Sequence, residues 1–182
     1  MKTDFSAYNN DWYKPGNAVK RMLWYYVNAV FFKSSLFPVY GLKVFLLRLF
    51  GARVGKGVLI KPNVNIKYPW FLHISDHVWI GEEVWIDNLA TVTIGSHVCI
   101  SQGAFLLCGN HDFTKTTFDL MVAPIIIEEG VWLGAKSIVC GGSVCKSHAV
   151  LAAGSLCNGA LEAYCVYQGN PAQRLKDRTI IG

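Results

Sequence analysis

Residues 127–156 read IEEGVW LGAKSI VCGGSV CKSHAV LAAGSL, five successive groups of six residues. Each group begins with an aliphatic residue or a cysteine and has a small or β-branched residue four positions later. The first positions are Ile127, Leu133, Val139, Cys145 and Leu151, and the fifth positions are Val131, Ser137, Ser143, Ala149 and Ser155. An unbroken period of six over this length is the strongest structural signal in the chain.

A period of six indicates a coil of three short, flat strands, each of which points one apolar residue into a triangular core. Successive coils then stack at the strand spacing of about 4.8 Å and pair through parallel ladders. Small residues suit the corners, where a large side chain would obstruct the turn. A sandwich would instead alternate with period two. The pattern predicts a mainly β protein, a parallel β-helix, and leaves its handedness open.

The same period extends upstream with interruptions. Earlier groups begin at Val54, Ile60 and Ile66, at Ile74, Ile80 and Ile86, and at Ile94, Ile100 and Leu106. An excursion at 67–73 and a slip at 92–93 separate these sets, and a longer break runs from about 107 to 126. We therefore expect a β-helix over 51–160 with a protruding loop at about 107–126, and a C-terminal tail over 161–182.

Residues 1–50 have helical periodicity. The apolar stripes are Val19, Met22, Leu23, Tyr26, Val27, Val30 and Phe31, and then Leu42, Phe45, Leu46, Leu49 and Phe50. Pro38 breaks the first helix and Gly51 stops the second. These amphipathic helices are expected to cap the open ladder edges of the first coil. Two interpretations remain for the stripes: packing on the chain's own domain or a partner chain, or attachment to a membrane surface.

Composition narrows the class of protein. The chain has 182 residues, 52% of them hydrophobic, and a net charge of +5 without a basic, aromatic-interleaved cluster, so nucleic acid is not an expected partner. The uncharged run 22–32 is shorter than the ~20 residues of a membrane span. Residues 1–10 lack a signal-peptide pattern, so a cytoplasmic protein is expected. The six cysteines form no C-x-x-C pair and are interpreted as core fillers.

Several stretches carry a family resemblance. They are 49–55 (LFGARVG), 68–70 (YPW), 85–89 (WIDNL), 109–112 (GNHD), 131–135 (VWLGA) and 169–172 (GNPA). In these the chain resembles the hexapeptide-repeat acyltransferases, among them the maltose, galactoside and nodulation-sugar O-acetyltransferases, and most closely those of colanic-acid-type exopolysaccharide synthesis. The resemblance runs from about residue 45 to the C-terminus. It implies a left-handed β-helix, a homotrimer with active sites between subunits, and acetyl-CoA as donor.

His111 is the candidate catalytic residue, because it lies where the repeat breaks and a long loop begins. An imidazole can remove the proton of a sugar hydroxyl as that hydroxyl attacks a thioester, and the resemblance places the general base here. The alternative is a surface histidine that caps a turn. Asp112 either orients the imidazole or caps the loop.

The resemblance also implies substrate contacts. Asp87 and Asn88, about one coil earlier, would bind the acceptor, unless they form a turn that satisfies its own backbone. Candidate acetyl-CoA contacts are Trp132, Ala135, Ala153, Arg174 and Lys176. Trp132 has a subunit interface as its alternative role, and the two alanines have a tight corner as theirs. The family's usual basic residue two after the proline is Gln173 here, which weakens the phosphate assignment to Arg174 and Lys176.

Other chemistries have less support. His73 and His77 are four residues apart, but their spacing differs from the zinc ligands of the related γ-type carbonic anhydrases, and no metal is expected. His97 and His148 fall at hexad corners and are expected to be exposed turn residues. No pattern for a covalent acyl-enzyme occurs, which favours direct transfer. A non-catalytic scaffold and an amino-sugar N-acetyltransferase remain as alternative functions; the latter usually carries an added nucleotide-binding domain.

Overall fold

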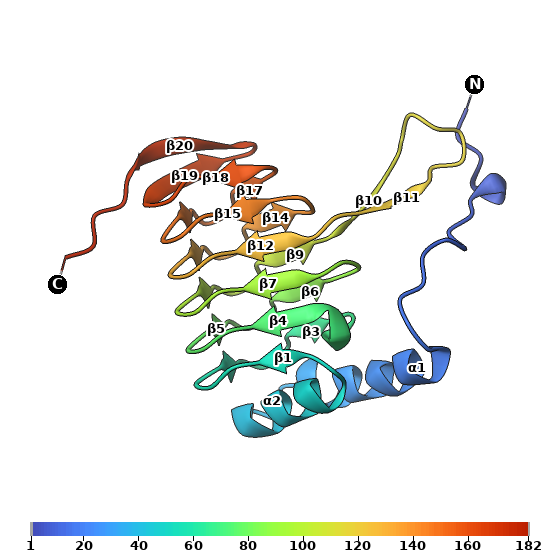
Figure 1. Cartoon of the computed structure of the whole chain (residues 1–182), viewed down its shortest axis with the longest axis horizontal. Helices are drawn as coiled ribbons and strands as arrows, with labels where there is room; N and C mark the ends of the chain where they lie inside the picture. The colour runs from blue at the N-terminus through green and yellow to red at the C-terminus, as the bar shows by residue number, and fades with distance from the viewer. Residues whose placement is uncertain (1, 182) are drawn as a thin grey trace.

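The computed structural model describes residues 2–181. Figure 1 shows a column of stacked β coils standing on two helices, with a long hairpin projecting from one side. Among the described residues, none of the helices has both the length and the apolar character needed to cross a bilayer.

Three parallel sheets form the sides of the column. Sheet 1 contains β1 (Arg53–Val54), β4 (Leu72–Ile74), β7 (Val92–Ile94), β12 (Ile125–Ile127), β15 (Val144–Cys145) and β18 (Ala160–Leu161). Sheet 2 contains β2 (Leu59–Ile60), β5 (Trp79–Ile80), β8 (Cys99–Ile100), β13 (Trp132–Leu133), β16 (Val150–Leu151), β19 (Cys165–Gly169) and β20 (Ala172–Asp177). Sheet 3 contains β3 (Asn65–Ile66), β6 (Trp85–Asp87), β9 (Phe105–Leu107), β14 (Ile138–Cys140) and β17 (Leu156–Cys157).

The first positions of the hexads form the core. Ile127, Leu133, Val139, Cys145 and Leu151 are all buried. Register follows the repeat, so that Ile86 pairs with Leu106 and Leu106 with Val139 on successive coils of sheet 3. This arrangement confirms the parallel β-helix that the hexads predict. The six cysteines are free thiols, and Cys108, Cys145, Cys157 and Cys165 are buried in the core.

Most corners of the coils contain a residue with left-handed backbone geometry. His77, His97 and His148 occupy such positions, with φ values of 57°, 58° and 61°. The rings of His77 and His97 stack with centroids 5.2 Å apart, and His148 stacks on Tyr164 at 4.7 Å. His97 is therefore an exposed turn residue, as predicted, whereas His148 is a turn residue that is half-buried rather than exposed, because Tyr164 stacks on its ring.

Helices seal the first coil. The base consists of α1 (Ala18–Val27), its π-helical continuation η2 (Asn28–Phe32), and α2 (Tyr40–Leu49). Trp24 is buried against Phe32 and donates a hydrogen bond from Nε1 to the carbonyl of Ile66 at 2.8 Å. Lys43, fully buried, donates to the carbonyls of Ile60 and Lys61. The helices thus satisfy ladder edges that would otherwise stay open, and burial lowers the pKa of Lys43.

The apolar stripes of these helices face largely away from the coils. Val19, Met22, Tyr26, Phe45 and Leu49 are each at least 55% exposed. Only the inner margins of the stripes, Val27, Phe31, Leu46 and Phe50, pack against the core. The expectation that the stripes pack on the chain's own domain is therefore wrong for most of their length, because a few large side chains on the opposite side already cover the first coil.

The chain's two ends also differ from the sequence prediction. Residues 2–17 are not part of a helical segment; apart from the short 3-10 turn η1 (Phe5–Ala7), they form an extended strap that rises from α1 to the hairpin (Figure 1). The β-helix does not end at residue 160, because β19 continues sheet 2 and β20 folds back on it antiparallel. An antiparallel closing strand has no hexad period, which explains why the pattern decays there.

The interruptions of the repeat are local insertions. The excursion after β3 contains the 3-10 turn η3 (Pro69–Phe71). The break at 107–126 is an antiparallel hairpin, here called the arm, made of β10 (Gly109–His111) and β11 (Leu120–Val122). The arm leaves the column at the corner between sheets 3 and 1, because it connects β9 to β12.

Candidate active site

His111 lies at the end of β10, and its imidazole is held on two sides by the arm. The ring stacks on Phe118 with centroids 4.4 Å apart and planes 10° apart. Its Nδ1 lies 3.0 Å from the carbonyl oxygen of Phe118. A carbonyl only accepts hydrogen bonds, so this contact assigns the proton to Nδ1 and leaves the lone pair of Nε2 free. An imidazole in this state can accept a proton.

The strap fixes the arm from outside. The backbone N–H of Asp4 donates to the carbonyl of Thr116 at 2.8 Å, and Phe5 packs edge-on against Phe118 at 5.4 Å. Further along the strap, the ring of Tyr8 lies 5.9 Å from that of His111. The position of His111 therefore depends on the packing of the strap against the arm.

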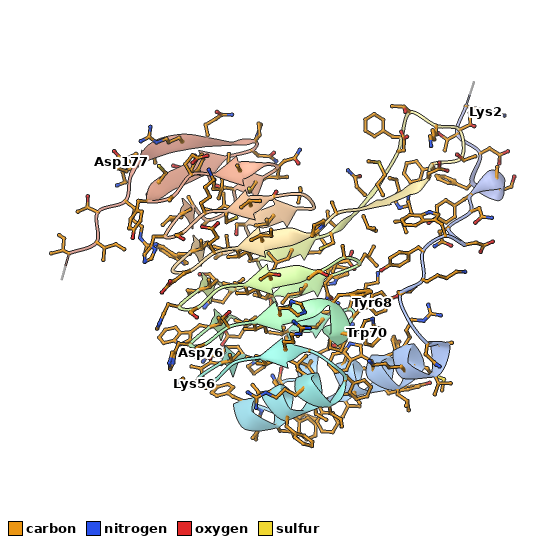
Figure 2. All side chains as sticks on the ribbon, viewed as in Figure 1. Lys2, Lys56, Tyr68, Trp70, Asp76 and Asp177 are labelled. Atoms are coloured by element: carbon orange, nitrogen blue, oxygen red, sulfur yellow. The ribbon has the colours of Figure 1, made fainter. Side chains whose placement is uncertain are left out.

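A cavity of about 510 Å³ opens between the strap, the arm and the coils. Its lining consists of Tyr8, Asn10, Tyr13, Pro15, Arg21, Lys67, Tyr68, Asp87, Leu89, Leu107, Gly109, Asn110, His111 and Leu120. Figure 2 shows Tyr68 and Trp70 on the side of the coils that faces the strap. Trp70 anchors the strap by donating from Nε1 to the carbonyl of Pro15 at 2.9 Å.

Asp87 contributes a buried carboxylate to this cavity. Its Oδ1 lies 3.1 Å from Nζ of Lys67, one coil below. The geometry of this ion pair leaves Oδ1 without a hydrogen bond from residues 2–181. A buried oxygen of this kind is costly unless a ligand supplies a donor. Asp87 therefore has the free acceptor that a substrate hydroxyl requires.

Asn88 is fully buried and its amide is occupied by the backbone of one residue. Its Oδ1 accepts from the N–H of Tyr68 at 3.0 Å, and its Nδ2 donates to the carbonyl of Tyr68 at 2.6 Å. Asn88 does not line the cavity, whereas Tyr68 does. Asn88 therefore contributes to an acceptor site only by holding Tyr68 in place.

Replacing Asn88 by alanine is expected to lower the free energy of unfolding by about 2 to 3 kcal/mol, because two buried backbone groups of Tyr68 lose their partner. Urea denaturation at fixed protein concentration measures this change. The exposed Asn158→Ala is the matched control and is expected to change stability by less than about 0.5 kcal/mol. Equal effects of the two substitutions would contradict the role of Asn88 in holding the backbone of Tyr68.

Asp112 faces the tip of the arm. It accepts hydrogen bonds from the hydroxyl and the N–H of Thr114, and these hold the pKa of its carboxyl below the usual value. Nζ of Lys115 lies 4.0 Å from its Oδ2. These contacts are those of a loop cap, the second of the two roles considered for this residue.

The candidate donor-binding residues lie elsewhere on the column. Trp132, on the outer face of sheet 2, donates from Nε1 to Oγ of Ser101 at 2.9 Å. Ala135 and Ala153 stack on adjacent coils at the corner between sheets 2 and 3, where the N–H of Gly154 donates to the carbonyl of Ala135.

The remaining two candidates lie on β20. Arg174 forms an ion pair with Asp177, and Lys176 lies beside it on the same strand. None of the five donor candidates lines the cavity at His111, since the arm leaves from a different corner.

Of the fourteen lining residues, only Asp87 and His111 were predicted from the sequence as site residues. Those that were missed include Tyr8, Tyr13, Arg21, Lys67 and Tyr68. Tyr13 donates to the carbonyl of Leu89 at 2.6 Å, and burial raises its pKa, so it remains protonated. The excursion of the repeat at 67–73 was the one available signal, because a chain that leaves the coil exposes side chains. The strap has no periodicity that could have placed its tyrosines.

A metal centre finds no support in the part of the chain that the structure describes. Within residues 2–181 no group of three or more His, Cys, Asp or Glu side chains is arranged to hold an ion.

Comparison with known proteins places the chain among acetyltransferases. No protein-family model matches it. It is 40% identical over 166 residues to WcaF of Escherichia coli strain K12, a proposed colanic acid biosynthesis acetyltransferase, with 91% of each chain covered. The galactoside O-acetyltransferase of the same strain is 24% identical over 135 residues, 72% of this chain and 66% of that enzyme.

A solved structure shares the fold. The hexapeptide-repeat acetyltransferase of Vibrio cholerae, crystallised with acetyl-CoA, matches with a TM-score of 0.82 at 20% identity, covering 92% of this chain and 93% of that one. The left-handed β-helix expected from the resemblance is thereby confirmed.

Proposed function

The chain belongs to the hexapeptide-repeat acetyltransferases and is an acetyl-CoA-dependent acyltransferase, and from this premise we propose that it acetylates a hydroxyl of a sugar or saccharide. In the proposed reaction His111 is the general base and transfer is direct. The observation that carries this proposal is the free Nε2 of His111 at the wall of a polar cavity, with Nδ1 held by the carbonyl of Phe118.

The proposed step balances without a further reactant. The acceptor hydroxyl gives its proton to Nε2 of His111 as its oxygen bonds to the thioester carbonyl carbon of acetyl-CoA. When the tetrahedral intermediate collapses, the C–S bond breaks, and the proton on His111 goes to the leaving thiolate. The stacking on Phe118 keeps the ring in place through both transfers.

The cavity fits a sugar acceptor. Tyr8 and Tyr68 offer aromatic faces on which a sugar ring can lie, and Oδ1 of Asp87 lacks a hydrogen-bond donor that a hydroxyl would supply. Lys67 forms an ion pair with Asp87 and fixes its carboxylate at the cavity wall. Because the charges of Lys67 and Asp87 balance each other, this site favours a neutral ligand group such as a hydroxyl.

The donor site requires a second copy of the chain. We infer a homotrimer in which the corner carrying Ala135 and Ala153 meets the arm of a neighbour, since these groups are apart within one chain. Exposed aromatic side chains on either side of that corner support this assembly: Trp79 and Trp132 on sheet 2, and Trp85 on sheet 3. Arg174 and Lys176 then remain the candidates for the CoA phosphates.

The test measures release of CoA thiol from acetyl-CoA across sugars, amino sugars, nucleotide sugars and short oligosaccharides. Turnover that requires a hydroxyl acceptor is expected. Turnover only with amino sugars would replace O-acetylation by N-acetylation. No turnover together with no CoA binding in calorimetry would favour a scaffold protein instead.

A further inference from the structure

The helical base presents an apolar surface that no segment within residues 2–181 covers. This apolar base face consists of Val19, Met22, Leu23, Tyr26, Val30, Phe45 and Leu49, all exposed. Figure 2 shows side chains projecting from both helices on the side away from the coils. A set of large apolar side chains gathered on one end of a protein marks an interaction surface.

The positive charge of the chain is concentrated in the segments that form the strap, the base and the first coil. Residues 12–75 contain ten of the seventeen Lys and Arg residues and none of the twelve Asp and Glu residues. The remainder of the chain is therefore net acidic. Lys56 illustrates the arrangement, because it lines one surface hollow together with Phe45 and Arg48 of α2, and Figure 2 shows it beside that helix.

A basic cavity borders the same face. Arg21, Lys33 and Lys67 line a space of about 360 Å³ on the flank of α1, and no Asp or Glu is among its lining residues. Tyr25, whose ring is exposed, belongs to both the lining and the edge of the base. The cations here have the chemistry to contact phosphate groups.

We propose that the apolar base face docks on the surface of an anionic lipid bilayer. The apolar side chains enter the headgroup boundary, and the surrounding lysines and arginines face lipid phosphates, which is how interfacial helices bind membranes. Tyr25 and Tyr26 are of the type that settles at the bilayer interface. A second copy of this chain is a poor occupant, because base-to-base contact would bring two surfaces together that are both rich in lysine and arginine.

The position of the base makes docking compatible with assembly. The base is at one end of the column (Figure 1). The exposed tryptophans that a trimer would cover, Trp79, Trp85 and Trp132, lie on the sheets that form its sides. In a trimer with parallel columns, the three bases point the same way and meet one flat surface together. Simultaneous contact raises the apparent affinity beyond that of one base.

The experiment is flotation of the full-length protein with phosphatidylcholine vesicles, with and without phosphatidylglycerol. Wild type is expected to float with anionic vesicles and to be released by 0.5 M salt, which shortens the electrostatic screening length to about 4 Å. Met22→Ser/Phe45→Ser is expected to weaken vesicle binding at least tenfold. Because both side chains are exposed, this variant should keep the wild-type unfolding midpoint and its turnover of a soluble acceptor.

Matched controls isolate the base. Leu175→Ser/Ile180→Ser removes two exposed apolar side chains at the other end of the chain and is expected to bind as wild type. Lys33→Glu/Lys56→Glu should weaken binding, whereas Lys136→Glu/Lys146→Glu should not.

Two results would overturn the proposal. One is equal vesicle binding by wild type and Met22→Ser/Phe45→Ser, including no binding by either. The other is sedimentation showing that the base variant splits an assembly larger than a trimer, since a second copy would then cover this face.

Discussion

His111→Ala is expected to lower acetyl transfer about a thousandfold while leaving the dissociation constant for CoA unchanged. General base catalysis by a positioned side chain contributes roughly 10²- to 10⁴-fold, and the ring makes no part of the proposed donor site. Initial rates of acceptor-dependent thiol release, together with calorimetry of CoA binding, measure the two quantities separately.

His97→Ala is the matched control for this substitution. It removes an imidazole from a coil corner, where the ring stacks on His77, and should leave turnover within about twofold of wild type at a temperature where the protein is folded. Transfer by His111→Ala within tenfold of wild type would mean that another group removes the proton.

Trp24→Ala is expected to have the largest effect on stability, about 3 to 5 kcal/mol in the free energy of unfolding. Its indole is 2% exposed, packs on Phe32 and Phe50, and ties α1 to the first coil through the carbonyl of Ile66. Its loss leaves both a cavity and an unpaired carbonyl at the base. Urea denaturation at fixed protein concentration gives the change, since the proposed assembly would make stability depend on concentration.

The adjacent Tyr25→Ala separates burial from helix propensity. Tyr25 belongs to the same helix and is 67% exposed, so its replacement is expected to change stability by less than about 0.5 kcal/mol. Similar losses from the two substitutions would show that the helix, rather than the buried indole, sets the stability of the base.

The β-helix could be predicted because its signal is local and repeated. Every coil places aliphatic residues such as Leu133 or Leu151 at the first position of its hexads. Each coil pairs with the coil that precedes or follows it along the chain. His111 could be predicted for the related reason that a break in the repeat exposes whatever follows. The sequence lacks any comparable signal for the direction in which α1 and α2 face, because an amphipathic stripe says that one side is apolar and not what covers it.

The cavity could not be assembled from the sequence for a different reason. Tyr8 meets His111 across more than a hundred residues, through a strap without periodicity. Asn88 was predicted to bind the acceptor, but its amide is occupied by the backbone of Tyr68. That partner depends on the excursion of the repeat at 67–73, which the sequence pattern did not place in space. The donor candidates were identified by family resemblance alone, and none of them lines the cavity at His111 within one chain. The proposed trimer would bring the two sets together.

The contact between the strap and the arm also sets an order of folding. Coils can form one after another as the chain emerges during synthesis, since each needs only its predecessor. Asp4, although among the first residues made, finds its partner Thr116 only after three coils exist. Closing so long a loop is slow compared with adding a coil. The column is therefore expected to form before the cavity. A newly made chain would for a time hold a folded column without a site, until the strap docks on the arm.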